Sequence, residues 1–143
     1  MNHNLEVSES VLINASAERI WEVLTTPAII SEYLYGTETI TDWKPGSEII
    51  FQGEYENTKY RDKGVILENI PLQKISYSYW SGFSGLADVP ENYSTVTYLL
   101  EAKGAQTVFT WQQKGFADES KLEHSKSGMT AFLAQIREIA ERK

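Results

Sequence analysis

The stretch "ASAERIWEVLTTPAIISEYL", residues 15–34, decides the fold, because it places helical sequence inside a chain that otherwise alternates like strands. Ser16 is typical of a helix N-cap. The apolar residues that follow fall on one helical face: Ile20, Trp21, Val23 and Leu24. Pro27 ends this helix, since proline lacks the amide hydrogen and clashes with the preceding turn, and it can start a second short helix that reaches about Tyr33. The stretch therefore predicts two short helices in succession.

The sequence on both sides predicts strands. Before the helices, apolar residues alternate with polar ones at Leu5, Val7, Val11 and Ile13, and Glu9 interrupts their face. After them, period-two patterns occur near residues 48–55, 65–67, 75–79, 96–100 and 108–111, and we count a short strand near residues 39–43. We therefore expect about seven strands joined mostly by short turns, which favours an antiparallel meander.

The last segment predicts one long amphipathic helix. Ser120 and Glu123 have the spacing of a capping box, and Asp118 precedes them. An apolar stripe follows at Leu122, Met129, Phe132, Leu133, Ile136 and Ala140. Gly128 inside this helix costs about 1 kcal/mol relative to alanine, so it predicts a close backbone contact or a bend.

Composition limits the function classes. The 143 residues suit one domain, residues 1–143, with 41% hydrophobic and 23% charged residues. No apolar run is long enough for stable membrane insertion, and the start lacks a basic region followed by an apolar one. Together with the absence of cysteine, this favours a cytoplasmic protein. The net charge of -7 repels phosphate backbones, so we expect no nucleic-acid partner.

Several pieces in order give a resemblance to a known family. These are "INASAERIWEVLTTP", "DWKPGSEIIF", "GVILENIP", "ISYSYW", "STVTYLLE" and "HSKSGMTAFLAQI". Together they resemble the activator of heat-shock-protein-90 ATPase homologue-like proteins of the START-like (SRPBCC) superfamily. The resemblance implies an α+β helix-grip fold, in which a curved antiparallel sheet wraps around a long C-terminal helix and leaves a cavity between them. Family members commonly have Gly-Trp in the last helix, where this chain has Gly128-Met129.

Aromatic residues recur at alternating strand positions, namely Trp43, Phe51, Tyr55, Tyr77, Tyr79, Tyr98 and Trp111. Each is explained either as ordinary core or as part of a cavity wall under the last helix, with Met129 and Phe132 opposite. The number of tyrosines favours a cavity, because a buried hydroxyl needs a partner that a wet or liganded pocket supplies.

Other candidates give weaker signals. Glu9 is either a carboxylate that points into the cavity or an edge residue that faces solvent. His3 and His124 have no partner at ligand spacing, so we expect no metal or other cofactor. The segment "SGFSGLADVPENYS", residues 81–94, is either a flap over a cavity mouth or a long turn.

Three functional hypotheses follow. The first is non-catalytic binding of a small hydrophobic or amphipathic molecule in the cavity. The second, from the family resemblance, is a partner-binding module associated with a chaperone, and homodimerisation through a sheet edge or the last helix is a related alternative. The third is a cyclase-like enzyme in which Glu9 or a cavity tyrosine acts as the acid-base group.

Overall fold

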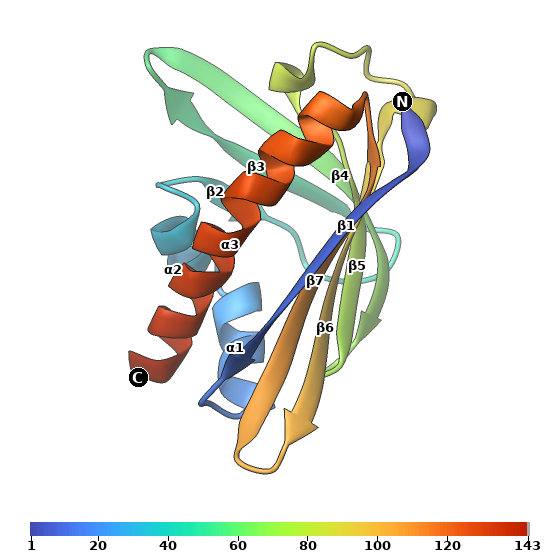
Figure 1. The fold of residues 1–143 in the computed structure, drawn as a ribbon. Helices are drawn as coiled ribbons and strands as arrows, with labels where there is room; N and C mark the ends of the chain where they lie inside the picture. The colour runs from blue at the N-terminus through green and yellow to red at the C-terminus, as the bar shows by residue number, and fades with distance from the viewer. Residues whose placement is uncertain (143) are drawn as a thin grey trace.

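The computed structural model describes residues 1–142 and contains one seven-stranded sheet with a long helix across its concave side (Figure 1). The elements in chain order are β1 (Asn2–Ile13), α1 (Ala17–Thr25), α2 (Pro27–Tyr33), β2 (Glu38–Ile40), β3 (Glu48–Tyr55), β4 (Thr58–Ile70), β5 (Lys74–Tyr79), two 3-10 turns (Gly82–Ser84 and Pro90–Asn92), β6 (Ser94–Lys103), β7 (Gln106–Phe116) and α3 (Glu119–Arg142). The predicted α+β helix-grip architecture is confirmed, with both short helices between β1 and β2.

The sheet is antiparallel, and its strands are ordered β1-β7-β6-β5-β4-β3-β2. Strands β2 to β7 therefore form the predicted meander, in which each strand pairs with the next. Strand β1 joins the far side of β7, with Val11 opposite Phe109. The first and last strands of the chain are thus neighbours, and β1 and β2 form the two edges.

A glycine in the middle of β4 marks the place where the sheet bends. The first half of β4 pairs with β3 as far as Val65, and the second half pairs with β5 from Ile66 onward. At Gly64 the backbone of β5 approaches so closely that a Cβ atom would lie 1.6 Å from the carbonyl oxygen of Ser78. Only glycine fits at this position. Beyond the bend, the β3–β4 hairpin projects past α3 (Figure 1).

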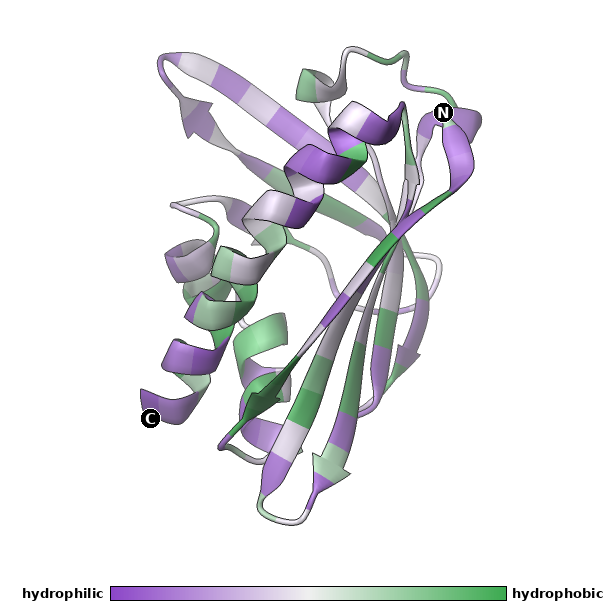
Figure 2. Ribbon diagram, in the orientation of Figure 1, coloured by the Kyte–Doolittle hydropathy of each residue, from purple (hydrophilic) through white to green (hydrophobic). Residues whose placement is uncertain are grey.

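The core lies between the sheet and the helices. Apolar segments of α1, α2 and the strands gather beneath the C-terminal half of α3, whereas the β3–β4 hairpin is largely hydrophilic (Figure 2). Helix α3 buries Met129, Leu133, Ile136, Ile139 and Ala140. Burying one such large apolar side chain contributes about 1.5–3 kcal/mol, so this stripe anchors the helix on the sheet. Within residues 1–142, no helix has both the length and the apolar character needed to cross a membrane.

Helix ends test the sequence predictions directly. The amide of Arg19 donates to Ser16 Oγ at 3.1 Å, so the predicted cap of α1 is confirmed. In α3 the amide of Lys121 donates to Asp118 Oδ1 at 2.9 Å. The prediction that Ser120 caps this helix was therefore wrong, because the cap is Asp118, two residues earlier, and Ser120 lies in the first turn.

Gly128 does not make the close backbone contact that the sequence predicts. It is exposed on α3, and no atom lies within 4 Å of the position that a Cβ would take. The predicted close backbone contact was therefore wrong, and alanine would fit this site without a clash.

Candidate functional site

A cavity of about 230 Å³ lies between the concave face of the sheet, the end of α2 and helix α3. Strands β3 to β7 supply most of its wall. Its lining residues are Leu34, Thr37, Phe51, Tyr60, Asp62, Tyr77, Tyr79, Val96, Tyr98, Trp111, Gln113 and Phe132. Several of these, including Leu34, Tyr60 and Gln113, are partly exposed, so the space is not sealed by the core.

Aromatic rings in mutual contact form most of this wall. Ring centroids are 5.8 Å apart for Tyr77 and Tyr98, 5.4 Å for Tyr98 and Trp111, and 4.2 Å for Trp111 and Phe132. Phe51 extends the series at 5.8 Å from Tyr77. Most of these contacts are edge-to-face, the arrangement that aromatic quadrupoles favour. The rings therefore support each other and give the cavity a stiff apolar surface.

Two hydroxyl pairs add polar points to the aromatic wall. The hydroxyl oxygens of Tyr77 and Tyr98 are 2.9 Å apart. Thr37 donates its hydroxyl hydrogen to the carbonyl of Leu34 at 2.7 Å, so its oxygen accepts a hydrogen bond from the Tyr60 hydroxyl. A ligand would thus meet hydroxyl groups that are already partnered inside the protein.

Burial also affects the acidity of these tyrosines. Desolvation raises the pKa of Tyr98 to about 12, despite an opposing effect of the hydrogen bond from Tyr77. It raises the pKa of Tyr77 well above its usual value, and the neighbouring Tyr98 adds to that rise. Both hydroxyls are therefore neutral at neutral pH and serve as hydrogen-bonding groups, not as bases.

Asp62 is the one carboxylate in the cavity lining. It is 8% exposed and accepts a hydrogen bond from the Tyr79 hydroxyl at 2.7 Å. The amide of Gly82 donates to its other oxygen at 3.3 Å. Burial, followed by the charge of Asp62, raises the pKa of Tyr79, so this hydroxyl keeps its proton and remains a donor.

Trp111 is a lining residue whose indole N–H is itself buried in the protein. Its Nε1 atom is buried and has no hydrogen-bond acceptor among residues 1–142. An unsatisfied buried donor costs about 1–3 kcal/mol.

The structure brings together six of the ten residues proposed from the sequence. The cavity-lining six are Phe51, Tyr77, Tyr79, Tyr98, Trp111 and Phe132. Tyr55 lies outside the cavity and is 63% exposed, because the β3–β4 hairpin extends beyond α3. Met129 is 3% exposed and belongs to the packed core. Trp43 is not a lining residue and packs against the core instead. Its own backbone has a positive φ of 66°, and its carbonyl accepts a hydrogen bond from the Asn69 side chain.

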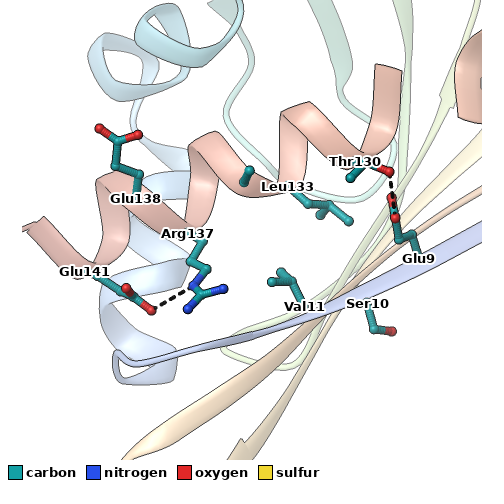
Figure 3. A pocket seen from close by; sticks show the side chains of 9 residues that line it. Glu9, Ser10, Val11, Thr130, Leu133, Arg137, Glu138 and Glu141 are labelled. Carbon is teal, nitrogen blue, oxygen red and sulfur yellow. Dashed lines mark hydrogen bonds and ion pairs between the residues drawn. The ribbon is translucent and has the colours of Figure 1, made fainter. Parts of the chain in front are cut away.

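Glu9 lies in a different place, a groove of about 470 Å³ between β1 and α3 (Figure 3). Its carboxylate points toward Thr130, whose hydroxyl donates to Oε1 at 2.8 Å. Farther along the groove, Arg137 Nε is 3.3 Å from Glu141 Oε2. Glu9 is half-buried under α3 without reaching the aromatic cavity.

Sequence reasoning missed six lining residues: Leu34, Thr37, Tyr60, Asp62, Val96 and Gln113. The signal for some of them was present. Tyr60 and Asp62 share the period-two face that leads through Gly64 to the buried Ile66, and Gln113 continues the face of Phe109 and Trp111. Extending each alternation along its strand would have placed these residues on the inward face, but it would not have shown that Asp62 is buried.

The long connection after β5 contacts the cavity wall. Besides the Gly82 amide on Asp62, the Phe83 ring lies 5.8 Å from that of Tyr60. The connection is also tied to the body, since Lys63 Nζ lies 2.6 Å from Asp88 Oδ2. It thus contacts two lining residues, Asp62 and Tyr60. No cluster of three His, Asp or Glu side chains that could bind a metal occurs in residues 1–142.

Known proteins share this fold over its whole length. The profile of the family described as "Activator of Hsp90 ATPase homolog 1-like protein" matches residues 14–141. The solution structure of ChR145 from Cytophaga hutchinsonii is 34% identical, with a TM-score of 0.85, covering 99% of this chain and 97% of the other. The crystal structure of MLL2253 from Mesorhizobium loti is 20% identical, with a TM-score of 0.79, covering 97% and 98%.

A more distant structure is the Aha1 dimer from Colwellia psychrerythraea, which is 16% identical with a TM-score of 0.75 and covers 96% of both chains. At such identities the last two similarities show the fold alone. A search of curated protein sequences found no significant match.

Proposed function

Because the chain belongs to the Activator of Hsp90 ATPase homolog 1-like family, we propose that it binds a small hydrophobic or amphipathic molecule in the cavity between the sheet and α3, without catalysing a reaction. The observation that carries the proposal is the cavity itself, an aromatic space with a few polar groups. Such a combination is typical of small-molecule sites, where the apolar wall gives affinity and the polar groups give orientation.

Energetics support an occupied cavity. If this space of 230 Å³ were sealed and dry, it would cost about 5.5 kcal/mol at about 24 cal/mol per Å³. That is as large as the whole stability of many domains, about 5–15 kcal/mol. The folded protein is therefore more stable with water or a ligand in this cavity than with the cavity empty.

The size restricts the ligand. An engineered apolar cavity of about 150 Å³ is known to hold benzene, so about 230 Å³ suits a molecule with one or two rings. A ligand burying about 200 Å² of apolar surface gains at most about 5 kcal/mol before association costs. Purely apolar ligands of this size should therefore bind weakly, and tighter binding requires polar contacts.

The experiment is a ligand titration followed by NMR on the indole N–H signals. The chain has 4 tryptophans, and Trp111 is the one in the cavity lining. Small aromatic compounds should shift the Trp111 signal, and a Val96→Phe variant, which places a ring in the cavity, should lose this response. Leu67→Phe is the matched control, because Leu67 is 50% exposed on β4. Equal binding by the Val96→Phe variant would refute this location.

The catalytic alternative has less support from the geometry. Asp62 and Tyr79 are hydrogen-bonded to each other, as are Tyr77 and Tyr98, and Glu9 lies in the other groove. The raised tyrosine pKa values keep these hydroxyls protonated at neutral pH, so no phenolate is available as a general base. Binding therefore explains the lining better than acid-base chemistry does.

A partner-binding role is a second candidate, and the family description is the observation that favours it. An effect on a chaperone ATPase would appear as a changed rate when the protein is added to the purified chaperone. An unchanged rate at saturating protein would remove this candidate and leave the cavity proposal intact.

A further inference from the structure

We propose that the preferred ligand of the cavity is a small organic cation, such as a hydrophobic amine or a quaternary ammonium compound, held by Asp62 and the surrounding aromatic rings. This inference rests on the proposed function and adds the charge of the ligand to it. Three observations carry it: the partners of the carboxylate, the composition of the wall and the charges around both.

Asp62 has neutral partners on both of its oxygens. The Tyr79 hydroxyl donates to Oδ2 and the Gly82 amide to Oδ1, at 2.7 and 3.3 Å. Each carboxylate oxygen can accept two hydrogen bonds, so acceptor capacity remains. Among residues 1–142 no lysine, arginine or histidine forms an ion pair with Asp62, and the neighbouring Lys63 pairs with Asp88 instead. A buried carboxylate without a cation favours a ligand that brings one.

The rest of the wall suits a cation with an apolar body. Its rings belong to Phe51, Tyr60, Tyr77, Tyr79, Tyr98, Trp111 and Phe132. The face of an aromatic ring attracts cations, and cages of several rings bind alkylated ammonium groups. Phe51 and Tyr79, whose centroids are 6.0 Å apart, connect the Asp62 side of the wall to the rest of the rings. A charged head and an apolar body can therefore be bound in the same small space.

The electrostatic surroundings agree with this assignment. None of the lining residues is a lysine, arginine or histidine. The whole chain has a net charge of -7, so its long-range field also favours a positive ligand. A carboxylate-bearing ligand such as a fatty acid would meet the charge of Asp62 with no compensating cation in the wall.

The test uses two probes of the same shape that differ in charge. The first, 3-hydroxyphenyltrimethylammonium, carries a permanent positive charge, and the second, 3-tert-butylphenol, has carbon in place of nitrogen. Titration calorimetry and the Trp111 NMR signal give both affinities for the full-length protein. We expect the cation to bind at least about tenfold more tightly, which corresponds to about 1.4 kcal/mol.

Asp62→Asn removes the charge and keeps an acceptor for the Tyr79 hydroxyl. It should weaken binding of the cation at least about tenfold and change binding of the phenol little. Glu54→Gln is the matched control, because it removes one charge from an exposed residue of β3 outside the cavity, and it should leave both affinities unchanged.

The outcomes separate this inference from the proposed function. Equal affinities, or tighter binding of the neutral probe, would overturn the cation assignment and leave the binding cavity standing. Failure of both probes to bind would count against the proposed function itself. If the Asp62→Asn variant did not fold, the ratio of the two affinities in the unmodified protein would still decide the matter.

Discussion

Replacing Gly64 with alanine provides the sharpest test of the geometry that shapes the cavity. The same substitution at Gly128 should raise the free energy of unfolding, whereas at Gly64 it should lower it. In a Gly64→Ala variant the new Cβ would lie 1.6 Å from the Ser78 carbonyl oxygen, whereas ordinary contact requires 3.4 Å. The backbones of β4 and β5 must therefore separate by about 1.8 Å. A flexible side chain cannot absorb this change, since the obstructing atoms belong to the main chain.

The expected cost follows from the contacts beside Gly64. The adjacent residue Lys63 exchanges two backbone hydrogen bonds with Trp80, at 3.0 and 2.8 Å. Losing both costs about 1–3 kcal/mol at about 0.5–1.5 kcal/mol each. Overpacking adds about 1–3 kcal/mol. The free energy of unfolding should therefore fall by about 2–6 kcal/mol, a large part of the stability of a domain this size.

Gly128→Ala is the matched control. An alanine Cβ at this exposed position of α3 meets no atom within 4 Å, and helix propensity favours alanine over glycine by about 1 kcal/mol. This variant should therefore gain about 0.5–1 kcal/mol. Urea unfolding at pH 7, followed by tryptophan fluorescence and far-UV circular dichroism, measures both changes. A Gly64→Ala variant that lost less than about 1 kcal/mol would refute the close approach of β4 and β5.

Three further predictions concern the cavity wall and helix α3. The free energy of unfolding should fall as the pH rises from about 10 toward 12, because the folded protein raises the pKa of Tyr98 to about 12 whereas an unfolded tyrosine titrates near 10. In a Tyr77→Phe/Tyr98→Phe double variant, the urea midpoint should decline less steeply above pH 10. Asp118→Ala should cost about 1 kcal/mol by removing the cap of α3, whereas Ser120→Ala should change the urea midpoint little. Leu133→Ala should cost about 2.7–5 kcal/mol in thermal or urea unfolding, since Leu133 is 2% exposed in the core.

Periodicity predicted the elements well, because burial on one face leaves a direct trace in the sequence. The alternation in the strands and the apolar stripe of α3 identified the sheet and the long helix. The proline at position 27 separated α1 from α2 through its missing amide. Helix caps were harder, since Asp118 and Ser120 are both good capping residues and only the exact start of the helix distinguishes them.

The cavity could be predicted only in part. Alternating aromatics marked the inward face of the sheet, but alternation does not reveal how far each strand extends beyond the core. Tyr55 shares the inward face of β3 with Phe51 and still lies in solvent, because its hairpin projects past α3. Asp62 was missed because a charged residue on an inward face has no apolar signal, and its burial depends on tertiary partners such as Tyr79.

The pairing of β1 with β7 has a consequence for how the protein is made. Translation delivers β1 before the other six strands, but among residues 1–142 the strand that pairs with it is β7, and 100 positions of the chain separate the two residues of the Ser10–Thr110 contact. At about 5–20 residues per second, the nascent strand waits about 5–20 seconds for that partner. During this time its backbone is free to pair with other chains, so aggregation during synthesis should depend more on the sequence of β1 than on any other strand.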